Sequence, residues 1–263
     1  MNARELRMLD ILKELSSSVG IIGVKAEFEA EGTRIDELFR LVEIARRANV
    51  KIALKIGGCE AVRDLLEAKQ IGVDFIVAPM IETTYALSKF VAAIQKTFSS
   101  DERSETSFLL NLETTTGFKN AVEMFDYAKS SGIVSGCVFG RVDYVGSLGL
   151  SRDDANSDRV CDDALVLAAE LKKREIDLVV GGAISVDSLS HLKKIHRIHL
   201  TKFETRKVVF SSQGLLNVGI DKALLLAVEF ELLWLQNKQS YYNQISTEDN
   251  ARIKMLNDRW KVL

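Results

Sequence analysis

The chain has 263 residues, 47% of them hydrophobic, which is enough for one large domain with a full core or for two small ones. Its 35 basic and 37 acidic side chains nearly balance, so the composition gives no support to nucleic acid or an anionic membrane as a partner. It has no apolar run long enough for a membrane span, no secretory-signal pattern at the N-terminus and three cysteines without CxxC spacing. These features predict a soluble cytoplasmic protein with reduced thiols.

Apolar strand-like runs alternate with amphipathic helical patterns along the chain. Strands are predicted at 19–29, 51–56, 74–80, 108–114, 136–143, 177–184 and 203–210. Helices are predicted at 1–18, 33–47, 59–70, 83–98, 118–129, 158–174, around His191 and at 221–242, with polar loops at 99–106 and 149–157. Apolar strands that alternate with helices indicate a parallel sheet covered on both faces.

The strand count favours a closed barrel. Seven strands are clear, and splitting either the run 19–29 or the stretch 195–210 gives an eighth, as a (β/α)8 TIM barrel of the α/β class requires. No GxGxxG or GxxxxGK[ST] motif follows any strand, which argues against an open nucleotide-binding sheet. With a single proline and no Ser/Gly-rich linker, we expect one domain over 1–263, with an N-terminal helix at 1–18 and a C-terminal helical extension at 221–263.

Charged side chains stand where the predicted strands end, and in a TIM barrel those ends form the active-site face. They are Glu27, Glu29, Lys55, Glu82, Glu113, Asp143, Glu204 and Arg206. Three of these carboxylates recur in an apolar-Glu-Thr triplet, in which the Thr is suited to cap the following helix.

Glu113 and Asp143 end two neighbouring strands and predict a site for a hard cation. Mg²⁺ is the expected ion and Mn²⁺ the second choice, because such ions accept one or two carboxylates and leave other positions to water and substrate. The alternative is that both residues form structural salt bridges and that Lys55 only extends its ammonium group to solvent. The late cluster His191, His196 and His199 lacks metal-ligand spacing and is interpreted as ordinary helix and surface residues.

The segments LNLETTTGFKNAVEMF and VFGRVDYVGSLGL, with IVAPMIETTYAL upstream, resemble the family of the citrate lyase beta chain and the class II pyruvate aldolases of the hydroxy-oxo-heptanedioate type. The resemblance covers roughly residues 24–184. It implies a phosphoenolpyruvate/pyruvate-binding TIM barrel that depends on a divalent metal.

The resemblance also implies roles for individual residues. Glu113 and Asp143 match the metal carboxylates, and the amides near Gly140 and Arg141 match the cradle for a substrate carboxylate. Lys55 stands where the family has an arginine that contacts the pyruvoyl oxygen, and Ala30 stands where the aldolases have a catalytic histidine.

With that histidine absent, the base is expected to be a metal-bound water, Glu29 or Glu82, and Arg206 is expected to contact substrate. The predicted function is that of an enzyme, a metal-dependent carbon–carbon lyase or aldolase acting on a 2-oxo acid or a related carboxylic acid or thioester. The alternatives are a phosphoenolpyruvate-using transferase or mutase and a non-catalytic carboxylate-binding barrel. The Leu-rich C-terminal helix favours a homo-oligomer, while substrate, pathway and coenzyme A use are left open.

Overall fold

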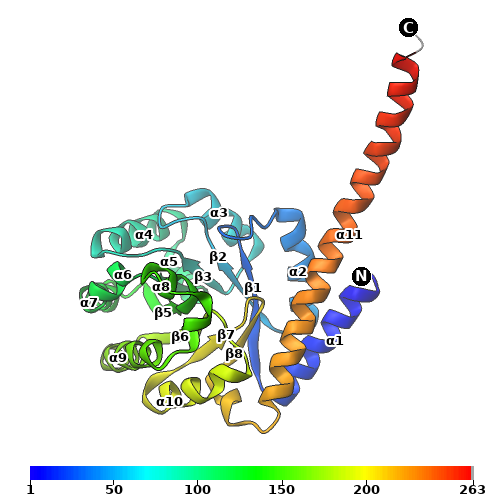
Figure 1. The fold of residues 1–263 in the computed structure, drawn as a ribbon. Coiled ribbons are helices and arrows are strands. Elements are labelled where there is room, and N and C mark those ends of the chain that lie inside the picture. Colours follow the sequence, from blue (N-terminus) through cyan, green and yellow to red (C-terminus); the bar gives the residue numbers. More distant parts are fainter. Residues whose placement is uncertain (262–263) are drawn as a thin grey trace.

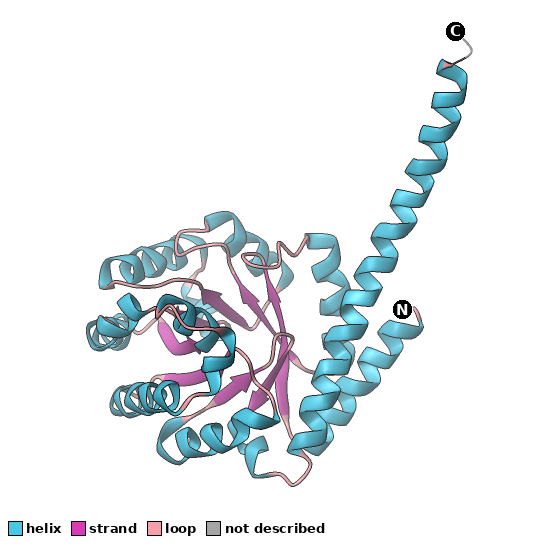
Figure 2. Ribbon diagram, in the orientation of Figure 1, coloured by secondary structure: helices cyan, strands magenta, loops and turns pink. Residues whose placement is uncertain are grey.

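The structure, a computed structural model, describes residues 1–261 and contains one closed barrel of eight strands in the order β1 to β8 (Figures 1 and 2). The strands are β1 Ile21–Glu27, β2 Lys51–Lys55, β3 Phe75–Ala78, β4 Ser107–Leu112, β5 Val134–Gly140, β6 Asp177–Gly181, β7 Lys202–Glu204 and β8 Val208–Ser211. The predicted eight-stranded barrel is therefore confirmed, and the eighth strand arises from the C-terminal stretch 195–210.

Most of the helices surround the barrel on its outer face (Figure 2). The helices of residues 1–261 are α1 Ala3–Ser18, α2 Ile35–Arg47, α3 Val62–Ile71, α4 Thr84–Thr97, α5 Ser100–Glu105, α6 Thr115–Lys119, α7 Ala121–Ser131, α8 Arg141–Ser147, α9 Asp158–Arg174, α10 Leu189–His199 and α11 Ile220–Trp260. Short 3-10 turns occupy Arg152–Asn156, Val186–Ser188 and Ser212–Leu216. No helix in the described range is both long enough and apolar enough to cross a bilayer.

Threonine side chains start two of the helices that follow strand ends. Thr83 accepts a hydrogen bond from the Ala86 amide and Thr114 accepts one from the Gly117 amide, as the repeated apolar-Glu-Thr triplet predicts. The third triplet behaves differently, because Thr205 lies in a turn and bonds to Val208.

The eighth strand runs against its neighbours. Strands β1 to β7 pair in parallel, whereas β8 is antiparallel to both β7 and β1. A parallel connection needs a crossover of a dozen or more residues, and only Thr205, Arg206 and Lys207 separate β7 from β8. The turn of this hairpin therefore lies at the carboxyl end of β7, on the active-site face.

Alternate residues along each strand point into or out of the barrel. Outward residues such as Leu54, Leu110 and Phe139 join the large core beneath the helices. Inside the barrel a small apolar cluster of Val77, Leu109, Val138 and Val179 fills the middle. Charged residues occupy the barrel interior between this cluster and the carboxyl ends of the strands. We call this open end of the barrel the mouth, and the apolar cluster forms its floor.

Three segments differ from the sequence predictions. The expected loop 99–106 contains α5, which Ser99 and Glu102 start with a reciprocal capping box. Asp143 lies in the first turn of α8, since β5 ends at Gly140. Helix α11 extends well past 242, and of the predicted extension 221–263 only the last two residues lie outside the described range.

Gly23 is a position where the barrel admits no side chain. An added Cβ would lie 2.2 Å from the Lys51 carbonyl oxygen on β2, which is a backbone atom that cannot rotate away. We expect Gly23→Ala to lower the free energy of unfolding by about 3 kcal/mol or more, because β1 and β2 must separate. Urea unfolding at constant m value measures the change.

Gly58→Ala is the matched control, because an added Cβ there has no atom within 4 Å. Its free energy of unfolding is expected to stay within about 0.5 kcal/mol of the parent value. Equal unfolding midpoints for the two variants would contradict the close approach of β1 to β2.

Candidate active site

A cavity of about 340 Å³ opens at the carboxyl ends of the barrel strands. Its lining comes from β1 to β7, from α8, from the β7–β8 turn and from α11. The lining carries more carboxylates than cations: Glu27, Glu29, Glu113, Asp143, Glu204 and Glu231 against Lys25, Lys55, Arg152 and Arg206. This imbalance favours a bound cation of double positive charge.

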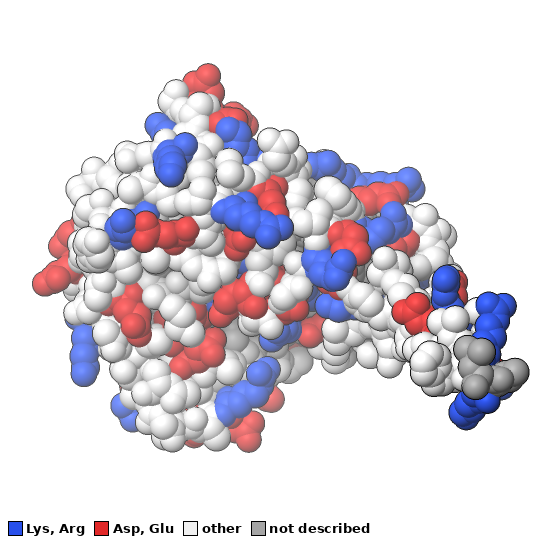
Figure 3. Space-filling model, turned by 90° about the horizontal axis from the view of Figure 1, so that it is seen from above, with Lys and Arg blue, Asp and Glu red and all other residues white. Residues whose placement is uncertain are grey.

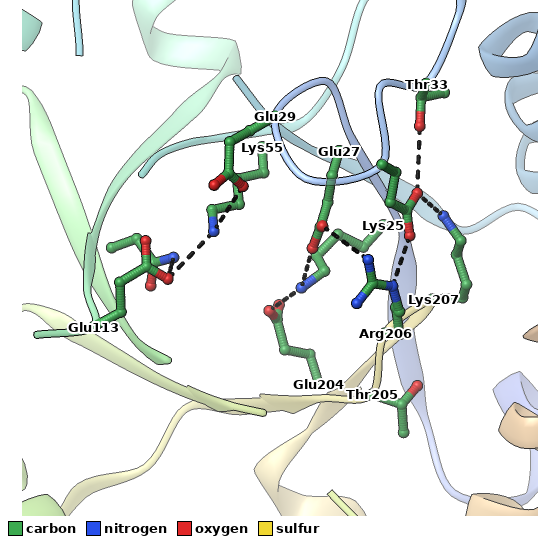
Figure 4. A network of polar contacts seen from close by, with 12 residues as sticks. Lys25, Glu27, Glu29, Thr33, Lys55, Glu113, Glu204, Thr205, Arg206 and Lys207 are labelled. Atoms are coloured by element: carbon green, nitrogen blue, oxygen red, sulfur yellow. Dashed lines mark hydrogen bonds and ion pairs between the residues drawn. The ribbon is translucent and has the colours of Figure 1, made fainter. Parts of the chain in front are cut away.

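Lys55, at the end of β2, lies between two of these carboxylates (Figure 4). Its ammonium nitrogen is 3.3 Å from Glu113 Oε2 and 3.1 Å from Glu29 Oε2. Burial alone lowers the pKa of Lys55, but Glu113 and Glu29 outweigh burial and raise this pKa above its usual value. Lys55 is therefore a fixed positive charge and not an amine nucleophile.

Lys25 forms a second cluster on the other side of the mouth (Figure 4). Its ammonium nitrogen is 2.6 Å from Glu204 Oε1 on β7 and 3.2 Å from Glu27 Oε1 on β1. Burial lowers the pKa of Lys25, and the two carboxylates outweigh this effect and raise it. The cluster connects β1 to β7 across the antiparallel strand β8.

The β7–β8 turn joins this second cluster to the outer rim. Arg206 Nε is 3.0 Å from Glu31 Oε1, and its Nη2 is 3.8 Å from Glu27 Oε2. Lys207, which is buried, pairs with the other oxygen of Glu31 and lies over the ring of Trp234 on α11. Half of the Arg206 side chain stays exposed at the entrance of the cavity.

Three glycines keep space open where β5 and β6 end. A Cβ on Gly140 would lie 2.9 Å from Glu113 Oε2, and one on Gly181 would lie 3.1 Å from Glu204 Oε1. A Cβ on Gly182, which has a positive φ, would lie 3.0 Å from the Arg141 amide nitrogen and 2.8 Å from that of Val142. The missing side chains leave the Glu113 carboxylate and two backbone amides accessible to a small molecule.

The side chain of Arg141 lies away from the cavity. Its guanidinium donates to the carbonyl oxygens of Gly181, Gly182 and Ala155 and to Oδ1 of Asn156, and it is almost fully buried. Burial lowers the pKa of Arg141 to about 10. The arginine thus holds the loop after β6 against α8, and only its backbone amide faces the space over Gly182.

The residues near Glu113 fit a divalent metal ion. Glu113 Oε1 accepts from the Met80 amide at 3.0 Å and Oε2 accepts from Asn111 Nδ2 at 2.6 Å, while Asn111 Oδ1 is buried without a hydrogen-bond partner. Burial raises the pKa of Glu113, Lys55 opposes this shift, and Asp143 raises the pKa further. A cation beside Glu113 and Asp143 would relieve that repulsion.

These donors are oxygens, as Mg²⁺ and Mn²⁺ prefer. Within residues 1–261 no three His, Cys, Asp or Glu side chains form a ready-made cage. The arrangement therefore suits an ion that keeps water or substrate oxygens in its remaining positions.

The structure brings most of the predicted site residues together. Glu29, Lys55, Glu113, Gly140, Asp143 and Arg206 all line the cavity. Glu82 does not; its carboxylate accepts a hydrogen bond from Thr114 at 2.6 Å, outside the lining.

Sequence reasoning missed Asn111 and Gly182. Side chains alternate along a strand, so Asn111, two residues before Glu113, lies on the same face as Glu113. This alternation is a local signal from which Asn111 could have been predicted. Gly182 contributes because its backbone lies close to the first amides of α8, where a side chain would not fit. The sequence contains no local signal for that contact.

Comparison with known proteins identifies a family for this chain. The model of the HpcH/HpaI aldolase/citrate lyase family matches residues 34–192, more than half of the chain. No curated protein matches the chain.

Among solved structures, an HpcH/HpaI aldolase from Desulfitobacterium hafniense DCB-2 is similar with a TM-score of 0.59 and 12% identity over 75% of this chain and 82% of that one. An HpcH/HpaI aldolase/citrate lyase family protein from Burkholderia cenocepacia J2315 gives a TM-score of 0.62 and 10% identity over 92% of each chain. The citrate synthase SbnG gives a TM-score of 0.57 and 14% identity over 75% of this chain and 81% of that one.

At such low identities the likeness to solved structures shows the barrel fold, whereas the family match shows descent. The matched segment carries Lys55, Glu113 and Asp143, and the resemblance seen in the sequence is confirmed. The chain therefore belongs to the HpcH/HpaI aldolase/citrate lyase family.

Proposed function

We propose that this protein is a metal-dependent carbon–carbon lyase that acts on a 2-oxo acid or a related carboxylic acid or thioester. The observation that carries the proposal is the pairing of Glu113 and Asp143 on one cavity whose carboxylates outnumber its cations. Membership of an aldolase and citrate lyase family supports lyase chemistry and a small-molecule substrate.

Glu113 and Asp143 would hold the metal, for which Mg²⁺ or Mn²⁺ is the proposed identity. When bound, such an ion supplies Lewis-acid stabilisation of the enolate that forms as a carbon–carbon bond breaks. Asn111 Nδ2 holds the Glu113 carboxylate in place through its hydrogen bond. The amide oxygen of Asn111 has no hydrogen-bond partner among the described residues and is a further oxygen available beside Glu113.

The remaining substrate contacts come from fixed positive groups. The amides of Arg141 and Val142, uncovered by Gly182, are suited to donate hydrogen bonds to a substrate carboxylate, and Lys55 would supply positive charge at the enolate oxygen. Arg206 at the entrance is suited to a second anionic group on a longer substrate.

Proton transfer falls to Glu29 in this proposal. Its side chain lines the cavity, and its Oε2 lies 3.1 Å from Lys55 without a well-directed hydrogen bond. Glu82 is less suited, since its carboxylate accepts a hydrogen bond from Thr114 and is not part of the cavity lining. The Glu29 carboxylate would thus take the role of the family histidine, at whose position this chain has Ala30.

A non-catalytic carboxylate-binding barrel is the second candidate. It is favoured by the pairing of both cavity lysines with carboxylates and by the absence of histidine from the described lining. We also propose a homo-oligomer in the cytoplasm, for which the family and the exposed apolar face of α11 give support.

The first test is calorimetric titration of oxalate, which mimics the pyruvate enolate, into protein stripped of metal and then reloaded with Mg²⁺ or Mn²⁺. We expect binding only with metal, and we expect Glu113→Gln to weaken it by about 100-fold or more, because one of two ligating carboxylates is lost. Glu82→Gln is the matched control and should bind oxalate as the parent does.

Oxalate binding that survives both EDTA and Glu113→Gln would rule out the metal-enolate proposal. Metal-dependent oxalate binding without cleavage of any 2-oxo acid, hydroxy acid or thioester in a substrate panel would favour the binding barrel. Turnover of phosphoenolpyruvate in the same panel would favour a transferase or mutase.

Substitution by methionine should affect stability at Arg141 and ligand binding at Arg206. Arg141→Met removes the donor from four acceptors, two of them in buried hydrogen bonds and two in partly buried ones, and we expect it to lower the free energy of unfolding by about 3 kcal/mol. Arg206→Met removes a half-exposed pair and should change stability by less than about 1 kcal/mol while it weakens binding of dicarboxylic 2-oxo acids.

Urea unfolding and titration with oxalate and a longer dicarboxylate measure both effects. A stable Arg141→Met protein with weakened oxalate binding would instead show that the Arg141 guanidinium contacts substrate.

A further inference from the structure

Helix α11 leaves the barrel for much of its length. It runs from Ile220 to Trp260 over 41 residues, and its buried residues all fall between Ile220 and Trp234. Every residue from 243 to 260 is exposed, and this part projects beyond the barrel (Figures 1 and 3). A single helix in water without packing is marginally stable, so a segment of this length calls for a partner.

The outer face of α11 carries an apolar stripe where the helix passes the barrel. Leu225, Val228, Leu232 and Leu235 follow each other at spacings of three and four residues, and each is more than half exposed. We call these four residues the proximal stripe. They lie on the opposite side of the helix from Phe230 and Trp234, which pack on the barrel.

The same heptad frame returns in the projecting part. Ile253, Leu256 and Trp260 lie 28 residues, or four heptads, after Leu225, Val228 and Leu232. All three are exposed, Trp260 by 78%. We call them the distal triplet. One helix thus carries two separate apolar segments in one register, neither covered by any described residue.

We propose that a second copy of this chain covers both segments, through an antiparallel pairing of two α11 helices. The distal triplet of each copy then lies on the proximal stripe of the other, as a two-fold axis requires. In the register that aligns them, Val228 faces Trp260 of the second copy, Leu232 faces Leu256, and Leu235 faces Ile253.

The polar positions of the frame favour the antiparallel direction. Asp249 occupies a core position of the heptad, and a parallel pair would set it against its own copy, with two like charges in contact. In the antiparallel register Asp249 faces Gln239, which offers an amide donor.

The charged residues that flank the two apolar segments also favour the antiparallel direction. Glu231 beside the proximal stripe and Arg259 beside the distal triplet hold the same heptad position, so the antiparallel pair brings opposite charges together. Lys238 and Arg252 also meet, but Lys238 is already compensated by Glu37 at 3.1 Å.

The pairing bears on the candidate active site. Val228 belongs to the proximal stripe and also lines the cavity, as does Glu231. A second copy that packs on Val228 therefore brings Trp260 to the edge of the cavity and narrows its entrance on the α11 side. This inference rests on the proposed function only where it concerns the entrance; the interface itself follows from α11.

Light scattering of the full chain tests the interface, with a dimer or a multiple of dimers as the expected result. Leu232→Glu and Leu256→Glu each place a charge in the proposed contact and should halve the measured mass. Val166→Glu is the matched control, since Val166 is equally exposed but lies on α9, and it should leave the mass unchanged.

Cysteine cross-linking tests the register in a Cys59→Ser background, because Cys137 and Cys161 are buried. The double variant with Leu235→Cys and Ile253→Cys should oxidise to a covalent dimer, while Leu235→Cys alone should not. Dimers from Leu235→Cys alone would indicate a parallel pair and overturn the proposal.

A full chain that is monomeric at every concentration, or a dimer that persists in both glutamate variants, would also overturn it. Binding of the monomer to lipid vesicles would assign the stripe to a membrane instead. Oxalate titration of the same samples separates the two proposals: a monomer that binds oxalate rejects only the interface, and a dimer that does not bind it rejects only the function.

Discussion

The mouth of this barrel depends on two buried lysines that each lie between two carboxylates. A buried charge is tolerated only when it is paired, and the pairs of Lys25 with Glu204 and of Lys55 with Glu113 connect strands that are distant along the chain. Because each lysine has two acidic neighbours, positive charge inside the mouth is already outnumbered. Such an excess of carboxylates favours a cation over an anionic substrate alone, and this electrostatic preference supports the proposed metal-dependent chemistry.

The β7–β8 hairpin links this site to the outside of the molecule. It places Arg206 at the entrance and returns the chain to the opposite end of the barrel, from which α11 runs back along α1 past the mouth (Figure 1). The hairpin and α11 both lie beyond the segment matched by the family model. Two segments outside the matched range thus lie at one side of the entrance, where a second copy is proposed to lie.

The family resemblance implies a retained pair of metal carboxylates and a changed set of proton-handling groups in this chain. Glu113 and Asp143 both line the cavity, and the same resemblance implies that Lys55 and Ala30 stand at the positions of a family arginine and histidine. Lys55 offers a single point charge in place of the planar fork of arginine, and it is tied to Glu29 as well as to Glu113. Any proton transfer must then use a carboxylate or water, which makes Glu29 the central residue of the proposed chemistry.

The sequence by itself determined the barrel class, most strand positions and the two carboxylates proposed to hold a metal, because the periodicity of strands and helices and the residue after a strand are local properties. It also contains the heptad frame of α11, although the local pattern predicts only a Leu-rich helix face. Only the tertiary structure decided that β8 is antiparallel, that Lys25 meets Glu204, and that the Arg141 side chain turns away from the cavity. These outcomes depend on closure of the barrel, which brings together residues far apart in the chain and fixes which charged groups must pair.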